Sequence, residues 1–143
     1  TARGYGREEA ERRKAGYRPG DWPPRAAGEV TTARGLHPDR ENDPVLLERL
    51  RAMQRRLGRQ VRARQAALVR LDGYADLERI ACPSLVAACR QDRLRSFAET
   101  ERMAQHLPGA RFAILEDCGH MAPLERPDEL TALLASWIEE AHL

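Results

Sequence analysis

Two different patterns of apolar residues divide the chain near residue 44. Before that point apolar side chains are scattered among glycines and prolines, so residues 1–43 are predicted to form mostly loop, with one short helix at about 7–15. From Pro44 onward the apolar residues recur at steps of three and four, which is the period of a helix. The residues of this stripe are Leu46, Leu50, Met53, Leu57 and Val61. We therefore expect an amphipathic helical segment over residues 44–75.

The ends of this helical segment carry local signals. Asp43 is a good N-cap because its carboxylate can accept backbone N–H groups of the first turn, and Pro44 suits the first helical position. Gly58 is predicted to break the helix, and a second short helix is expected from about Gln60 to Val69.

The second half of the chain has the pattern of a strand, a helix, a second strand and a last helix. Continuous apolar runs at residues 84–89 and 111–116 are predicted as strands of a parallel sheet. Between them, Ser96 and Glu99 form a capping box at the start of a helix that ends near Pro108. A strand–helix–strand unit of this length predicts a right-handed crossover and an α/β fold class.

The last helix is predicted to start at Pro127, with acidic residues in its first turn. Its apolar residues have helical spacing and should cover one face of the sheet: Leu130, Leu133, Leu134, Trp137 and Ile138. Two strands leave free sheet edges, and this apolar stripe would stay half covered. We therefore expect that the chain by itself is not a stable monomer.

Composition narrows the classes of protein to consider. The chain has 143 residues, of which 42% are hydrophobic and 32% charged, and its apolar runs are far shorter than a membrane span. Thr1 opens the chain without the regions of a signal peptide, so we expect a cytoplasmic protein. Cys82, Cys89 and Cys118 contain no C-x-x-C pair, which predicts reduced, mostly buried thiols and no metal site.

Charge is unevenly distributed along the chain. Residues 1–70 hold 17 Lys and Arg against 9 Asp and Glu, a balance of +8, whereas residues 71–143 hold 7 against 13, a balance of −6. Arginine supplies 23 of the 24 basic residues, which fits either a nucleic-acid-binding arm or a genome rich in arginine codons. We favour the second interpretation and expect no nucleic-acid partner, because acidic residues are interspersed and few aromatics are present to stack on bases.

Two polar side chains follow the predicted strands at one edge of the sheet. Asp92 lies three residues past the first strand, and His120 lies four past the second. A carboxylate beside an imidazole suits acid–base chemistry, because the carboxylate fixes the imidazole tautomer while the imidazole moves a proton. On spacing alone an ordinary structural role remains a strong alternative, because a loop Asp is usually a turn or cap residue and a Gly-His loop is often simply a turn. His37 is interpreted as a loop histidine.

At these residues the chain resembles the α/β-hydrolase fold family. Residues 80–94, I-A-C-P-S-L-V-A-A-C-R-Q-D-R-L, are similar to the strand and acid loop of that family. Residues 107–127, L-P-G-A-R-F-A-I-L-E-D-C-G-H-M-A-P-L-E-R-P, resemble its final strand, histidine loop and Glu-x-Pro start of the last helix. The resemblance covers residues 76–143 well, residues 30–75 more softly as a helical lid, and residues 1–29 only loosely.

The resemblance implies the C-terminal part of a doubly wound α/β-hydrolase sheet, preceded by a lid. Residues 1–43 would be an arm and the start of the lid, residues 44–75 the helical lid, and residues 76–143 the core. It implies Asp92 as the triad acid and His120 as the general base in hydrolysis of an ester, a lactone or a related small-molecule carbonyl substrate, without a cofactor. Two positions depart from the family pattern, since Cys89 stands in place of a glycine and Arg95 in place of a proline.

The nucleophile motif of that family, Gly-x-Ser-x-Gly, is absent from the sequence. The chain contains three serines, which are expected in a strand, at a helix cap and in the last helix: Ser84, Ser96 and Ser136. The resemblance therefore implies a fragment that is inactive alone and that pairs with a missing N-terminal half or self-associates through its strand edge. The alternative is a non-catalytic binding or assembly module built on a hydrolase scaffold.

Overall fold

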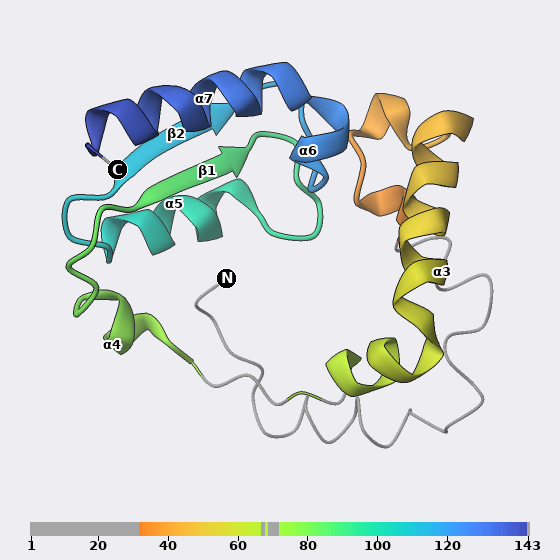
Figure 1. Ribbon diagram of the computed structural model, residues 1–143, viewed down its shortest axis with the longest axis horizontal. Coiled ribbons are helices and arrows are strands. Elements are labelled where there is room, and N and C mark those ends of the chain that lie inside the picture. Colours follow the sequence, from red (N-terminus) through yellow and green to blue (C-terminus); the bar gives the residue numbers. More distant parts are fainter. Residues whose placement is uncertain (1–31, 67, 69–71, 143) are drawn as a thin grey trace.

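The computed structural model of the protein describes residues 32–66, 68 and 72–142 (Figure 1). The helix predicted at about 7–15 lies outside the described residues. In chain order the elements are a 3-10 helix η1 (Pro38–Arg40), helices α3 (Pro44–Ala66) and α4 (Tyr74–Leu77), strand β1 (Leu85–Cys89), helix α5 (Phe97–Gln105), strand β2 (Arg111–Leu115), and helices α6 (Ala122–Glu125) and α7 (Pro127–Glu140).

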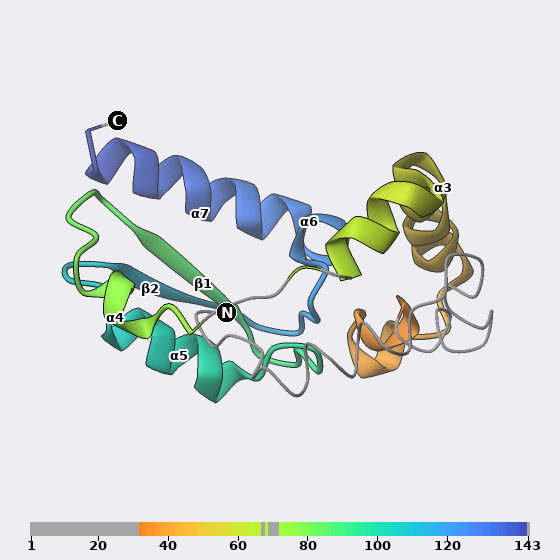
Figure 2. The same ribbon diagram turned by 90° about the horizontal axis from the view of Figure 1, so that it is seen from below.

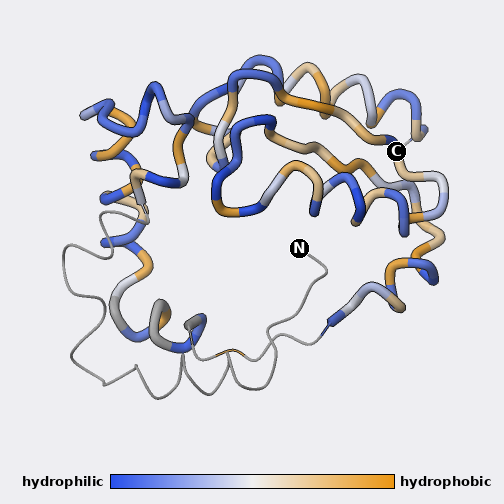
Figure 3. Tube along the Cα trace, turned by 180° about the vertical axis from the view of Figure 1, so that it is seen from behind, coloured by the Kyte–Doolittle hydropathy of each residue, from blue (hydrophilic) through white to orange (hydrophobic). Residues whose placement is uncertain are grey.

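Strands β1 and β2 form a parallel pair whose register runs from Leu85 opposite Arg111 to Cys89 opposite Leu115. Helix α5 connects them, and Figure 2 shows α7 on one face of the pair and α5 on the other. Both strands consist mainly of hydrophobic residues, as the hydropathy colouring of Figure 3 shows. The predicted strand–helix–strand unit is confirmed, with Ser84 just outside β1.

The core of the sheet is small. Leu115, Cys118 and Ala122 are buried together, and Leu130 and Leu133 of α7 pack against them. On the same helix Leu134 is 40% exposed and Ile138 is 44% exposed. The expectation that the apolar stripe of the last helix is only partly covered is therefore confirmed.

The helix ends follow the local signals in the sequence. Asp43 Oδ1 accepts the backbone N–H groups of Val45 and Leu46 at 2.8 and 3.0 Å. Gly58 interrupts α3 with φ 70° and ψ 166°, a left-handed backbone angle that a residue with a side chain rarely adopts. The predicted helix break is confirmed at this glycine.

A second cluster of buried side chains joins the start of α3 to the end of the sheet where α6 lies. Leu36, Leu46 and Leu50 form it, and Met121 and Leu124 pack against it. Figure 1 shows the arrowheads of both strands directed toward this side of the molecule. Across the described ranges, no helix combines the length and the apolar character needed to cross a membrane.

Candidate active site

The carboxylate of Asp92 and the imidazole of His120 meet at the edge of the sheet where β1 and β2 end. His120 Nδ1 lies 2.8 Å from Asp92 Oδ2. Asp92 follows β1 and His120 follows β2, so the parallel pairing of the strands brings the two loops together. The prediction that these side chains are neighbours is confirmed, and we refer to them below as the Asp92–His120 pair. Their part in a reaction stays a prediction.

Reciprocal hydrogen bonds between Gln91 and Cys118 fix the distance between the two loops. The backbone N–H of Gln91 donates to the carbonyl oxygen of Cys118, and the side-chain Oε1 of Gln91 accepts the backbone N–H of Cys118, each at 3.0 Å. Cys118 packs beside Cys89 at the end of β1. Burial raises the pKa of both thiols, so they stay protonated and act as packing residues.

Asp92 is held by its own loop. Its Oδ1 atom accepts the backbone N–H groups of Leu94 and Arg95 at 2.7 and 2.9 Å, which leaves Oδ2 for His120. Burial of the carboxyl raises its pKa, but the hydrogen bonds from His120 and the two amides outweigh burial and hold the pKa of Asp92 below its usual value. Asp92 is therefore an ionised acceptor with a fixed orientation.

His120 is directed outward from this anchored carboxylate. The side chain of His120 is 41% exposed, whereas that of Asp92 is 9% exposed. The ionised Asp92 carboxylate can only accept a hydrogen bond, so His120 Nδ1 must donate it. In the neutral ring the proton therefore lies on Nδ1, and Nε2 carries the lone pair. The geometry therefore presents a basic nitrogen at the surface that these loops form.

A second carboxylate lies behind the His120 loop. The side chain of Glu125, at the end of α6, is 0% exposed. Its Oε1 atom accepts the backbone N–H of Gly119 at 3.1 Å. Its Oε2 atom accepts the backbone N–H of His37 at 2.8 Å and the Nε–H of Arg40 at 3.2 Å. Glu125 thus ties the segment around η1 to the residue that precedes His120.

Asp117 pairs with the segment around η1 and not with His120. Its Oδ1 atom lies 3.2 Å from Nε2 of His37, and its carboxylate also accepts from Arg40. His37 Nδ1 accepts the backbone N–H of Asp39 at 3.1 Å, so the ring proton lies on Nε2 and points to Asp117. His37 lies in a loop as predicted, yet it is 7% exposed and holds two segments together.

None of the three serines supplies a hydroxyl to the Asp92–His120 pair within the described residues. The Ser84 hydroxyl donates to a carbonyl just before β1, Ser96 caps α5, and Ser136 donates to a carboxylate within α7. Ser84 therefore lies at the opposite end of β1 from Asp92. These places agree with the absence of a nucleophile motif in the sequence.

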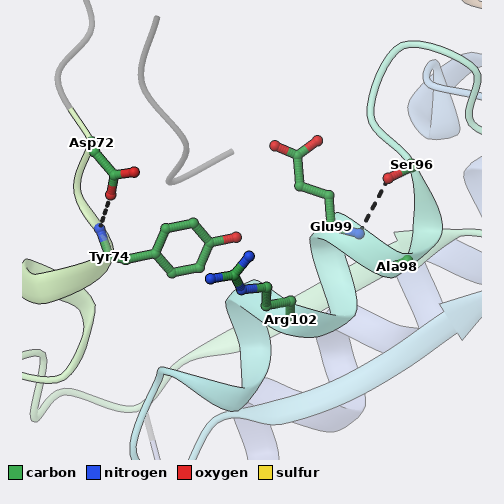
Figure 4. Close-up of a pocket in the computed structure, with 6 residues that line it drawn as sticks. All are labelled: Asp72, Tyr74, Ser96, Ala98, Glu99 and Arg102. Carbon is green, nitrogen blue, oxygen red and sulfur yellow. Dashed lines mark hydrogen bonds between the residues drawn. The ribbon is translucent and has the colours of Figure 1, made fainter. Parts of the chain in front are cut away.

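A separate pocket of about 400 Å³ lies between α4 and α5, and neither Asp92 nor His120 lines it (Figure 4). The guanidinium carbon of Arg102 lies 4.9 Å from the centre of the Tyr74 ring, and the Ser96 hydroxyl is occupied by the N–H of Glu99. The residues that line it are Asp72, Tyr74, Ser96, Ala98, Glu99 and Arg102. Asp72 accepts the backbone N–H of Tyr74, and the only hydroxyl among the lining serines and threonines already accepts a backbone N–H.

Sequence reasoning missed the contributions of His37 and Glu125. They are 88 residues apart in the chain, and no local period or spacing shows that a backbone N–H of one will meet the carboxylate of the other. The Glu-x-Pro start of the last helix marked the position of Glu125, but gave no sign that its side chain is buried.

Comparison with known proteins identifies the family. A model of the alpha/beta hydrolase family matches residues 2–133. Epoxide hydrolase EphH of Mycobacterium tuberculosis is 39% identical over 75 residues, which are 49% of this chain and 34% of that protein. A putative carbamate hydrolase, RutD of a Caulobacter species, is 33% identical over 78 residues, 54% of this chain and 29% of that protein.

Solved structures of the same fold extend the match over the chain. A thermophilic esterase from Thermogutta terrifontis superposes with a TM-score of 0.82 at 27% identity, covering 100% of this chain and 54% of that one. A hydrolase from Pseudomonas aeruginosa superposes with a TM-score of 0.72 at 27% identity, covering 90% of this chain and 48% of that one. The chain thus spans about half the length of these structures and about a third of the curated relatives. Because the family match runs over most of the sequence, this chain belongs to the alpha/beta hydrolase family.

Proposed function

We propose that this chain supplies the general base and its orienting acid to an esterase or lactonase reaction. His120 Nε2 takes the proton of an attacking serine hydroxyl and later returns it to the leaving alcohol. Asp92 keeps the His120 proton on Nδ1 and stabilises the imidazolium that forms. The observation that carries this proposal is the 2.8 Å contact between His120 Nδ1 and a carboxylate whose pKa is held low.

The substrate class rests on chemistry and on the relatives. A serine–histidine–carboxylate set attacks an electrophilic carbonyl carbon and releases an alcohol or an acid without a redox cofactor. A thermophilic esterase is among the similar structures, at 27% identity. We therefore assign small esters, or the cyclic esters called lactones, as the substrate class.

The nucleophile comes, in this proposal, from polypeptide outside these 143 residues. The similar esterase is nearly twice as long as this chain, which covers 54% of it. The part of that esterase beyond the match is long enough to hold a strand, a nucleophile turn and the backbone amides that stabilise an oxyanion.

Two surfaces of this chain fit such a polypeptide. β1 pairs with β2 on one side, and among the described residues no strand pairs with its other edge, whose backbone groups are open to a further strand. Farther along α3, Met53 and Leu57 continue the buried stripe and are 48% and 45% exposed, and Val61, beyond the break at Gly58, is 43% exposed. An N-terminal hydrolase half would cover both surfaces, and a second copy of this chain is the alternative occupant of the strand edge.

A complementation assay tests the proposal. The chain is mixed with the part of the Thermogutta terrifontis esterase that it does not cover, and p-nitrophenyl ester hydrolysis is measured for each piece and for the mixture. We expect turnover in the mixture only, sensitive to a serine-directed phosphonate and lost in His120→Ala. The exposed His142, replaced by Ala, is the matched control and should leave turnover unchanged.

The assay also separates the alternative function. A complex that forms stably but hydrolyses nothing contradicts the catalytic proposal and favours a binding or assembly module on a hydrolase scaffold. Turnover that survives His120→Ala also contradicts the assignment of the base.

A further inference from the structure

Glu125 is a fully buried carboxylate that lies next to, but outside, the Asp92–His120 pair. A buried charge is costly unless every lone pair finds a donor. Here Oε1 accepts one backbone N–H and Oε2 accepts a second backbone N–H and a guanidinium N–H, at 2.8 to 3.2 Å. Three donors to one carboxylate satisfy it and fix its position.

The groups that Glu125 binds belong to two segments far apart in sequence. One is the N–H of Gly119, the residue before His120. The others come from His37 and Arg40, at the two ends of η1. Arg40 also binds Asp117, two residues before Gly119, so the loop is held at both Asp117 and Gly119.

The loop has no room to move at this point. A Cβ atom on Gly119 would lie 2.5 Å from the backbone nitrogen of His37, 2.5 Å from the backbone carbon of Leu36 and 2.8 Å from Glu125 Oε1. These distances are far inside van der Waals contact. The backbone before His120 is therefore pressed against the segment around η1 and clamped there by the carboxylate.

We propose that Glu125 is a positioning residue, which acts through the Gly119 backbone to hold the His120 ring against Asp92. The catalytic importance of this inference rests on the proposed function, but the contact itself lies within this chain and can be tested without turnover. The amides of its own loop fix the position of the Asp92 carboxylate, and Glu125 fixes the position of the backbone that carries the His120 ring.

The test reads the His120 ring directly. The full chain is labelled with 15N at histidine, and the Nδ1 proton and the tautomer of His120 are followed by NMR in wild type and Glu125→Gln. We expect a single Nδ1–H tautomer with a slowly exchanging proton in wild type. In Glu125→Gln we expect loss of the slow proton signal and a mixture of tautomers, because an amide cannot accept all three donors.

Two further variants separate positioning from general loosening of the fold. Val86→Ala deletes buried methyl groups in β1 without touching the loop, and should lower the urea midpoint while leaving the His120 signals as in wild type. Glu125→Asp keeps the charge on a shorter arm and replaces Glu125→Gln if that variant fails to fold. It should also lose the slow proton.

The inference is overturned if a folded Glu125 variant keeps the wild-type His120 signals, or if Val86→Ala loses them to the same extent. Turnover plays no part in this measurement. An assembly with wild-type His120 signals and no ester hydrolysis would contradict the proposed function and leave this inference standing.

Discussion

The backbone of Gly119 lies against the backbone of His37 so closely that no side chain fits between them: a Cβ atom there would stand 2.5 Å from the His37 nitrogen. Residues that are 82 positions apart in the chain thus form the wall behind His120. The loop that carries His120 owes its shape to this long-range contact.

Gly119→Ala should therefore lower the free energy of unfolding by about 1–3 kcal/mol, because the backbone of one segment must shift. The comparison variant is Gly109→Ala, where φ is 68° but the space is open, so only the left-handed strain of about 1 kcal/mol applies. Urea midpoints at equal protein concentration measure both. A Gly119→Ala midpoint within the range of a neutral surface substitution would show that the two segments are not in contact.

The lowered pKa of Asp92 predicts a loss of stability in acid. An Asp carboxyl in an unfolded chain titrates near pH ~3.9. Below that pH and above the lower pKa of folded Asp92, the unfolded chain binds more protons, so stability falls as the pH drops. The contribution is complete above about pH 5, where both states are ionised.

Urea midpoints between pH 6 and pH 3 test this dependence. The fall should be smaller in Asp92→Asn than in wild type, because the asparagine has no proton to gain. The exposed Asp128, replaced by Asn, should follow the wild-type profile. Parallel profiles for wild type and Asp92→Asn would contradict the anchored, ionised carboxylate.

The three thiols should react at different rates with a disulfide reagent such as dithiobis(nitrobenzoate). Cys82 is exposed, Cys89 is half-buried and Cys118 is buried. Burial raises the pKa of Cys89 and Cys118, which reduces their thiolate fraction. We expect one fast thiol, lost in Cys82→Ser, and reaction of Cys118 only in denaturant. Fast labelling of Cys118 in the native chain would contradict the packing at the end of β1.

The uncovered strand edge and apolar side chains predict self-association of the chain alone. Ile114 and Leu134 are each 40% exposed, and partial burial of such side chains forfeits part of the ~1.5–3 kcal/mol each would contribute. Sedimentation at micromolar protein should show dimers or larger species, which convert to a 1:1 complex when the complementary esterase half is added. A monodisperse monomer with a sharp unfolding transition would contradict this expectation.

Local signals predicted most element boundaries, because a helix cap or a helix break depends on only a few neighbouring residues. The Asp43 cap, the break at Gly58 and the Ser96 cap all lie where the sequence indicated. Short helices α4 and α6 were not predicted, since four residues are too few to show a period.

Packing of the predicted faces could be seen only in three dimensions. The apolar residues of α3 keep a helical spacing in sequence up to Gly58, yet Leu46 and Leu50 are buried while Met53 and Leu57 are exposed. Periodicity reports which face of a helix is apolar, but not how far a partner extends along it. The same limit hid the contact between Glu125 and His37.

The central claim is that Asp92 acts through His120, and a double-mutant cycle tests it most directly in the complex of this chain with the complementary esterase half. The kcat for ester hydrolysis is compared in wild type, Asp92→Asn, His120→Gln and the double variant. We expect Asp92→Asn alone to lower kcat by about 10⁴-fold, as the wrong tautomer does in other triads, and to cost almost nothing further in the His120→Gln background. Losses that multiply in the double variant would show that Asp92 acts independently of His120, and would contradict the account.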